Sequence, residues 1–267
     1  MQTKIRVGAV SYLNTKPLVY GFEHGMMTEK VDLVINYPSK IASMLLENTI
    51  DVGLVPVTVI PEMKEYHIIS DYCIGCDGEV ASVCLFSEVP LNKIEKVLLD
   101  YQSLTSIDLL KILITQYWKI NPVLEETTGE YRSKISGTTG ALIIGDRALE
   151  QRKISSYIFD LGYEWKKFTG LPFVFAAWVS NKKLDEEFII SFNETNLFGL
   201  TKIDRIVMDN LYSFFDLKDY YTKYIRYSLD DDKRKGLKVF LEKISTSHLP
   251  GVTKVANFKI QPVLKLK

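Results

Sequence analysis

The chain has 267 residues, more than the commonest size of a single domain, so one large or two medium-sized domains are expected. Its 33 Lys and Arg residues equal its 33 Asp and Glu residues, and no long block of one sign occurs, which argues against a nucleic-acid or anionic membrane partner and favours a small ligand. No apolar stretch approaches the roughly 20 residues that span a bilayer, and residues 1–4 lead into a strand pattern without the apolar region of a secretory signal, so a cytoplasmic protein is expected.

Strand and helix patterns alternate from the N-terminus onward, which predicts an α/β protein built from β-α-β units. A short apolar strand precedes a helix that begins near Pro17, because proline suits the first turn of a helix. A second strand, a helix opened by Pro38 and a fully apolar third strand follow. The expected ranges are 5–10, 16–25, 31–35, 38–46 and 51–57.

A second set of strand and helix patterns predicts a lobe inserted into the first. It consists of strand 96–100, an amphipathic helix through about residue 118, and strands 122–125 and 141–145. Segments near Pro90 and Pro172 suit a pair of hinge crossings between the lobes. We therefore expect lobe 1 to comprise residues 1–88 and 176–267 and lobe 2 to comprise residues 89–175, with a ligand cleft between them.

The last third of the chain, from Leu184 onward, has helical periodicity and is expected to brace the first lobe. Its tyrosines include Tyr220, Tyr221, Tyr224 and Tyr227, which recur at helical spacing. Such spacing is typical of core packing and argues against a platform on which nucleic-acid bases stack.

Three cysteines are present, and Cys73 and Cys76 form a lone C-x-x-C motif, followed by Cys84. A zinc site needs further ligands, and His67 is the only histidine nearby, so no metal site is expected. A redox role is the weaker alternative because Cys73 lies in an apolar segment and not at a helix N-terminus, which would lower its pKa. We expect the cysteines to be small buried side chains.

Polar tips at the ends of predicted elements are the candidate ligand-binding features. In open α/β sheets, small ligands bind at the carboxyl ends of the strands, and helix N-termini attract carboxylates without a fixed arginine. Two facing lobes would thus form an anion site from neutral donors, although each tip is also consistent with an ordinary turn or helix cap. The tips are Ser11 with Asn14 and Thr15, residues 78–82, Ser103 with Thr105 and Ser106, and residues 138–140.

Familiar catalytic motifs are missing from the sequence, which has no glycine-rich phosphate loop, G-x-S-x-G elbow or H-E-x-x-H pattern. Asp77 and Glu79 are typical of solvated loop residues. Asp146 fits a helix cap better than an acid catalyst.

Two longer strings are much more specific than any short catalytic pattern: S-Y-L-N-T-K-P-L at residues 11–18 and T-G-L-P-F-V-F-A at residues 169–176. Together with segments 51–56, 82–87, 143–146, 160–165 and 224–227, they are distributed over most of the length of the chain. In these segments the chain resembles the chorismate dehydratase family of the futalosine pathway of menaquinone biosynthesis. The resemblance implies a two-lobed, periplasmic-binding-protein-like fold of type II, in which each lobe is a mainly parallel sheet flanked by helices.

The resemblance also implies the reaction and its residues. Members of this family remove water from chorismate to give 3-[(1-carboxyvinyl)oxy]benzoate, a lyase reaction, with no cofactor, and the resemblance assigns catalytic roles to Asn14 and Ser82. One difference is Ala81, where family members often have arginine, so one substrate carboxylate must rely on other donors. Together, the polar tips and the segments of the resemblance give the expected substrate-binding residues, which are Ser11, Tyr12, Thr15, Ser103, Thr105, Ser106, Thr169 and Gly170.

The chemistry suits a site with few acids and bases. The C3 proton of chorismate is allylic and vinylogous to the ring carboxylate, so its removal gives a delocalised dienolate, and loss of the C4 hydroxyl yields an aromatic ring. We hypothesise that Asn14 and Ser82 position the leaving hydroxyl and the ether side, while the Ser103 tip holds a carboxylate. Two groups are candidates for the base that removes the C3 proton: the enolpyruvyl carboxylate of the substrate and a protein carboxylate such as Glu79.

Two alternative functions remain. The same fold serves non-catalytic proteins that bind small carboxylates, and a fold does not settle a function; the missing secretory signal disfavours this class. The related 1,4-dihydroxy-6-naphthoate synthase of the same pathway shares the fold, but its first-strand loop differs from the string at residues 11–18.

Overall fold

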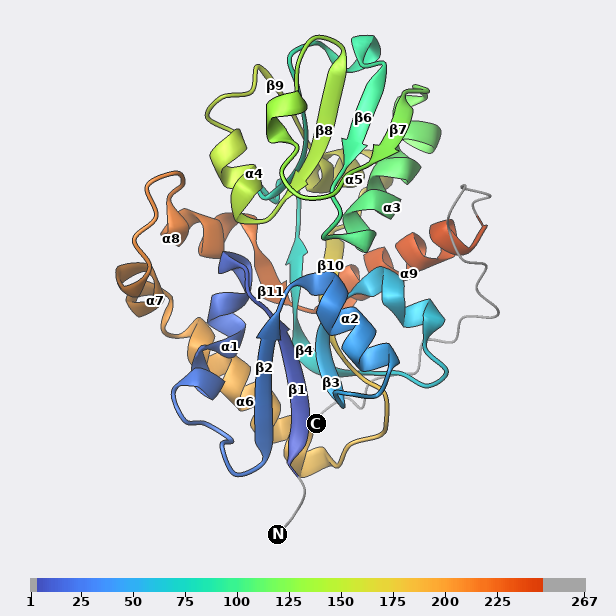
Figure 1. The fold of residues 1–267 in the computed structure, drawn as a ribbon. Coiled ribbons are helices and arrows are strands. Elements are labelled where there is room, and N and C mark those ends of the chain that lie inside the picture. The colour runs from blue at the N-terminus through green and yellow to red at the C-terminus, as the bar shows by residue number, and fades with distance from the viewer. Residues whose placement is uncertain (1–3, 247–267) are drawn as a thin grey trace.

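Two β-sheets, each flanked by helices, form the two lobes of the protein (Figure 1). The structure, a computed structural model, describes residues 4–246. Residues 247–267, which the sequence assigned to lobe 1, and residues 1–3 lie outside the described part of the chain. Within it, the expected alternation of strands and helices is confirmed.

The first sheet has six strands in the order β11-β4-β10-β3-β1-β2. Its strands are β1 (Ile5–Val10), β2 (Val31–Asn36), β3 (Val52–Pro56), β4 (His67–Cys76), β10 (Phe173–Ser180) and β11 (Arg226–Ser228). β1 pairs with β2 and β3 in parallel, whereas the pairs that join β10 to β3, β10 to β4 and β11 to β4 are antiparallel. β3 is buried along its full length, as its unbroken apolar sequence predicts.

The second sheet has five strands in the order β7-β6-β8-β5-β9. Its strands are β5 (Val83–Ser87), β6 (Lys96–Leu99), β7 (Val123–Glu126), β8 (Thr139–Ile144) and β9 (Tyr157–Asp160). β6 pairs in parallel with β7 and β8, whereas β5 pairs antiparallel with β8 and β9. The expectation of mainly parallel sheets is therefore wrong, because both sheets are mixed. The strands that follow the two crossings between the lobes, β5 and β10, run against their neighbours.

The positions of the crossings also differ from the expected lobe boundaries. β4 ends at Cys76 in the first sheet and β5 begins at Val83 in the second, so the chain crosses in residues 77–82 and not near Pro90. It returns in residues 170–172, between helix α5 and β10, and Pro172 lies in this second crossing. β5 belongs to lobe 2 because it hydrogen-bonds to β8 on one side and β9 on the other.

Helices cover both sheets (Figure 1). They are α1 (Lys16–Glu23), α2 (Pro38–Leu46), α3 (Leu104–Ile112), α4 (Asp146–Gln151), α5 (Leu161–Thr169), α6 (Glu186–Leu200), α7 (Ile203–Asp209), α8 (Leu217–Asp219) and α9 (Asp231–Thr246). Three shorter turns, η1 (Leu13–Thr15), η2 (Val57–Glu62) and the π-helical turn η6 (Tyr220–Tyr224), lie near the junction of the lobes. α3 continues as a π-helical segment to Trp118, where the amphipathic pattern predicted its end.

The C-terminal elements reach both lobes, whereas the sequence assigned them to lobe 1 alone. α6 packs against α1 in the first lobe, but α9 contacts both β10 of the first lobe and α3 of the second. Lys243 in α9 donates to the side chain of Gln116 in lobe 2 at 2.8 Å. The predicted packing role of the tyrosines is confirmed for Tyr220, Tyr221 and Tyr227, which are buried.

All three cysteines are buried free thiols, as predicted. Burial raises the pKa of the Cys73 thiol to about 12, which makes the thiol inert at neutral pH. Among residues 4–246, no helix combines the length and apolar character needed to cross a membrane.

Candidate functional site

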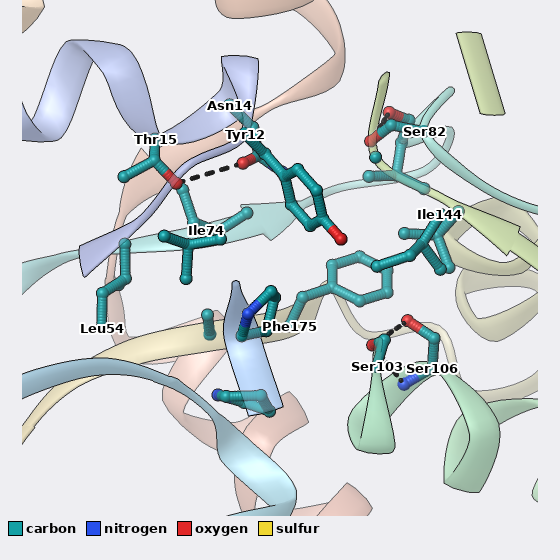
Figure 2. A pocket seen from close by; sticks show the side chains of 17 residues that line it. Tyr12, Asn14, Thr15, Leu54, Ile74, Ser82, Ser103, Ser106, Ile144 and Phe175 are labelled. Atoms are coloured by element: carbon teal, nitrogen blue, oxygen red, sulfur yellow. Dashed lines mark hydrogen bonds between the residues drawn. The ribbon is translucent and has the colours of Figure 1, made fainter. Parts of the chain in front are cut away.

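A cavity of about 540 Å³, including the space at its open mouth, lies between the two lobes (Figure 2). Lobe 1 contributes residues from β1, η1, α2, β3, β4 and β10 to its wall, and lobe 2 contributes Val80, Ser82 and Val83, the start of α3 and the end of β8. The predicted cleft between lobes is therefore present as a cavity with walls from both lobes.

The wall of this cavity combines an apolar surface with neutral hydrogen-bonding groups. Leu54, Ile74, Ile144 and Phe175 supply large apolar side chains (Figure 2). The hydroxyl and amide groups belong to Tyr12, Asn14, Thr15, Ser82, Ser103 and Ser106. Apart from the phenol of Tyr12, none of the seventeen lining side chains in the described part of the chain is ionisable. The site thus suits the binding and orientation of a ring compound more than acid or base catalysis by the protein.

Asn14 lies in η1, directly after the first strand. β1 ends at Val10, and the turn η1 carries the chain into α1, where Pro17 occupies the first turn as predicted. The Asn14 side-chain oxygen accepts a hydrogen bond from the Thr15 hydroxyl at 3.3 Å, and the Asn14 carbonyl accepts one from the Tyr227 hydroxyl at 2.9 Å. Two neighbours therefore hold this turn at the edge of the cavity.

Ser82 stands at the end of the first crossing, on a backbone that lobe 2 fixes. The carboxylate of Asp160 accepts hydrogen bonds from the N–H groups of Val80 and Ala81 at 2.8–3.2 Å, and the same carboxylate caps α5. Ala81 has a φ of 63°, a left-handed conformation that is unusual for alanine. The N–H of Gly145 donates to the Ser82 carbonyl at 2.8 Å. These contacts set where the fully buried Ser82 points.

Position 81 offers no cation to the cavity. Ala81 is buried and does not line the wall, so the arginine implied for this position by the resemblance has no counterpart here. Arg147 places a guanidinium near Tyr12, which lines the cavity. Its Nη2 donates to Asp100 at 2.8 Å and to the side-chain oxygen of Gln102 at 3.0 Å. The same Gln102 oxygen accepts from the Tyr12 hydroxyl.

Ser103 and Ser106 line the cavity at the start of α3. The Ser103 hydroxyl caps the helix by accepting from the Ser106 N–H at 3.3 Å and donates to the Ser106 hydroxyl at 2.8 Å (Figure 2). Thr105, from the same tip, does not line the cavity, because its position in α3 directs it to a different side of the helix from Ser106. Its hydroxyl instead accepts from the N–H of Thr58 in η2 at 3.3 Å, which joins the lobes.

Three further residues expected to bind substrate lie elsewhere. Ser11 is exposed, and its N–H donates to the Asn36 carbonyl at 3.0 Å. The Thr169 hydroxyl donates to the Trp165 carbonyl at 2.9 Å, and Gly170 is the left-handed residue that ends α5. The string at 169–176 therefore encodes a helix end, the second crossing and the start of β10, where Phe175 and Ala176 line the cavity. The structure brings together Tyr12, Asn14, Thr15, Ser82, Ser103 and Ser106.

The protein base considered above is also outside the cavity. Glu79 is exposed and does not line the wall. Asp146 was interpreted as a helix cap, but Gly145 is the cap residue and Asp146 begins α4. Its Oδ1 accepts from the N–H of Leu13 across the lobes at 3.2 Å, and burial raises its pKa to about 6.

Tyr220 is the residue beside the site that the sequence interpretation missed. Its hydroxyl donates to the Ser82 hydroxyl at 2.7 Å, which joins η6 to the first crossing. No sequence pattern distinguishes it from tyrosines that only pack, because all of them follow helical spacing. Only the folded chain brings residues 138 positions apart into contact.

Similarity to known proteins agrees with this geometry. A sequence model of proteins of menaquinone biosynthesis matches residues 5–246. The chain belongs to this menaquinone biosynthesis family. A chorismate dehydratase of Thermus thermophilus is 26% identical over 267 residues, covering 91% of this chain and 96% of the relative. A chorismate dehydratase of Campylobacter jejuni is 34% identical over 122 residues, covering 45% of this chain and 48% of the relative.

The fold of this family member also matches solved structures. The conserved Candida albicans CA3427 gene product, described as having the generic periplasmic binding protein structural fold, aligns with a TM-score of 0.60 and 10% identity. The alignment covers 96% of this chain and 99% of that chain. The implied periplasmic-binding-protein-like fold is therefore confirmed.

Proposed function

We propose that this protein is a chorismate dehydratase, a lyase that removes water from chorismate to give 3-[(1-carboxyvinyl)oxy]benzoate. Two relatives with this name and the family membership support the assignment. The single observation that supports it most from this chain is that Asn14 and Ser82, far apart in sequence, line one cavity between the lobes. An apolar wall beside hydroxyl and amide groups fits a ring with polar substituents.

The first step is loss of the C3 proton, and the lining of the cavity favours one base for it. Glu79, the protein alternative, is exposed and outside the cavity, and the lining side chains include no carboxylate or imidazole. The enolpyruvyl carboxylate of chorismate, attached through the ether oxygen at C3, is therefore the base in this proposal. It takes the proton, and the electron pair of the C–H bond enters a dienolate conjugated with the ring carboxylate.

The second step is loss of the C4 hydroxyl. The dienolate electrons return to form the aromatic ring as the C4–O bond breaks, and the departing hydroxide takes the proton held by the enolpyruvyl carboxylate and leaves as water. Asn14 and Ser82 supply hydrogen bonds to the leaving hydroxyl and the ether side as charge develops there. Aromatisation provides the driving force, so the protein contributes orientation and hydrogen bonds.

The ring carboxylate is held at the start of α3 in this proposal. Ser103 and Ser106 line the cavity there, and a helix N-terminus favours an anion through its dipole and unpaired N–H groups. Thr105 takes no part because its hydroxyl is used between the lobes. Neutral donors thus replace a guanidinium at position 81.

The test is incubation of the purified protein with chorismate, followed by mass spectrometry and ultraviolet spectroscopy. The expected product is lighter than chorismate by one water and has the absorption of a substituted benzoate. Saturable binding of chorismate without this product would favour a non-catalytic binding protein. A protein that neither binds nor converts chorismate would refute the proposal. The naphthoate synthase reaction would then be the candidate to assay.

A further inference from the structure

We infer that Tyr220 is a positioning residue for the dehydration: its phenol hydrogen-bonds Ser82 from behind the cavity wall and turns the Ser82 proton toward the substrate. This inference rests on the proposed function. Tyr220 does not line the cavity itself, so it acts through the serine and not on the ligand. It comes from η6, a part of the chain that the sequence assigned to packing alone.

The hydrogen bonds of Ser82 define the direction of its proton. The Tyr220 hydroxyl donates to the Ser82 hydroxyl oxygen at 2.7 Å, a short and fully buried contact. Within the protein, the Ser82 hydroxyl donates to the Val80 carbonyl at a long 3.5 Å. Since Ser82 accepts a strong hydrogen bond and makes only a weak one, its proton is available to a group in the cavity. Accepting from Tyr220 also polarises the serine O–H and makes it a better donor.

The same phenol also lies near Asn14, the second residue of the pair. Burial raises the pKa of Tyr220 well above its ordinary value, and the neighbouring Ser82 and Asn14 side chains oppose this effect. The phenol therefore stays protonated and remains a donor at neutral pH. Tyr227 supports the same arrangement from the backbone side by donating to the Asn14 carbonyl at 2.9 Å.

The substitution Tyr220→Phe tests the inference because it removes only the hydroxyl and keeps the ring, which packs against Phe215 and Tyr221. We expect kcat for chorismate to fall roughly 10- to 100-fold, with KM changed less than about threefold. The matched control is Tyr221→Phe, the next residue in the same turn. It is equally buried, and its hydroxyl has no hydrogen-bond partner among the described residues, so kcat should stay within about twofold of wild type.

A double-mutant comparison separates positioning from a general structural effect. If Tyr220 acts through Ser82, then Tyr220→Phe should lower kcat little further in a Ser82→Ala background. An equal fold loss in both backgrounds, or a Tyr220→Phe enzyme with wild-type kcat, would overturn the inference. A wild-type protein without dehydratase activity would instead overturn the proposed function, so the two failures are distinguishable.

A variant with almost unchanged shape covers the case in which Tyr220→Phe does not fold. Site-specific 3-fluorotyrosine at position 220 makes the phenol a stronger donor with little change in volume. We expect kcat to change at least twofold at position 220 and less at position 221. An unchanged kcat with the substitution at position 220 would contradict a role for this phenol.

Discussion

The Tyr12 hydroxyl hydrogen-bonds the side-chain oxygen of Gln102, 90 residues further along the chain, and so joins the two lobes beside the cavity. The same oxygen accepts from Arg147, whose guanidinium pairs with the buried carboxylate of Asp100 at 2.8 Å. Tyr12 is thereby connected to an ion pair within lobe 2. Because Tyr12 also lines the cavity, this contact links the relative position of the lobes to the shape of the site.

Tyr12→Phe is expected to weaken closure and substrate binding. A hydrogen bond of this kind contributes about 0.5–1.5 kcal/mol, so KM for chorismate should rise roughly 2- to 10-fold while kcat changes little. Steady-state kinetics measure this, and small-angle scattering should show a larger radius of gyration in the absence of ligand. Tyr101→Phe is the control, because its hydroxyl accepts from Gln102 within the same lobe. An equal rise in KM for both variants would contradict a role in closure.

Gly145→Ala should damage both stability and activity. Gly145 has φ 64° and ψ −148°, a conformation reserved for glycine, and an added Cβ would lie 3.3 Å from the Tyr12 ring. The backbone strain should lower the free energy of unfolding by about 1–3 kcal/mol, and the contact with Tyr12 should raise KM. Gly137→Ala is the control: its φ is 56° but open space surrounds it, so it should lose stability with kcat/KM unchanged. Urea unfolding and kinetics distinguish the two.

Asn14→Ala should lower turnover far more than binding. Its amide is proposed to act as the C4–O bond breaks, so the loss should appear in kcat, roughly 100-fold, with KM near that of wild type. Asn36→Ala at the end of β2, outside the cavity, serves as the control. A pure rise in KM for Asn14→Ala would assign Asn14 to ground-state binding.

Asp146 should make stability depend on pH. Burial raises its pKa in the folded protein to about 6, whereas the pKa of an Asp in the unfolded protein is about 3.9. Between these values the folded state holds more protons than the unfolded state, so the free energy of unfolding falls as pH rises from about 4 to about 6. Asp146→Asn should lack this loss, which amounts to at most about 3 kcal/mol. Urea unfolding at several pH values measures the difference between the proteins; a difference independent of pH would refute the assignment.

Much of the fold follows from local patterns. The apolar run of β3 and the prolines at the starts of α1 and α2 indicated strands and helices that the structure contains. The crossing near Pro90 was misplaced because β5 is a short strand buried between β8 and β9, and periodicity does not say to which sheet a strand belongs. The direction of the strands could not be predicted either, because it depends on where the chain crosses between the lobes.

The residues of the cavity could be predicted in part: Asn14 follows β1 and Ser82 lies between β4 and β5, and both were expected as polar tips. The site was not predictable where the same residue types perform structural tasks. Thr105 serves a contact between lobes and Thr169 a helix end, yet in sequence both resemble binding residues. Tyr220 is the opposite case: a side chain with every feature of core packing touches the candidate catalytic serine.

Ser82 is the last residue of the first crossing, while Tyr220 extends from the C-terminal third of the chain. A swing of one lobe about residues 77–82 and 170–172 would separate the serine from the phenol that orients it. The hydrogen bond that orients Ser82 would then form only when the lobes close on the ligand. Elimination would therefore begin only once closure has also removed bulk water from the cavity.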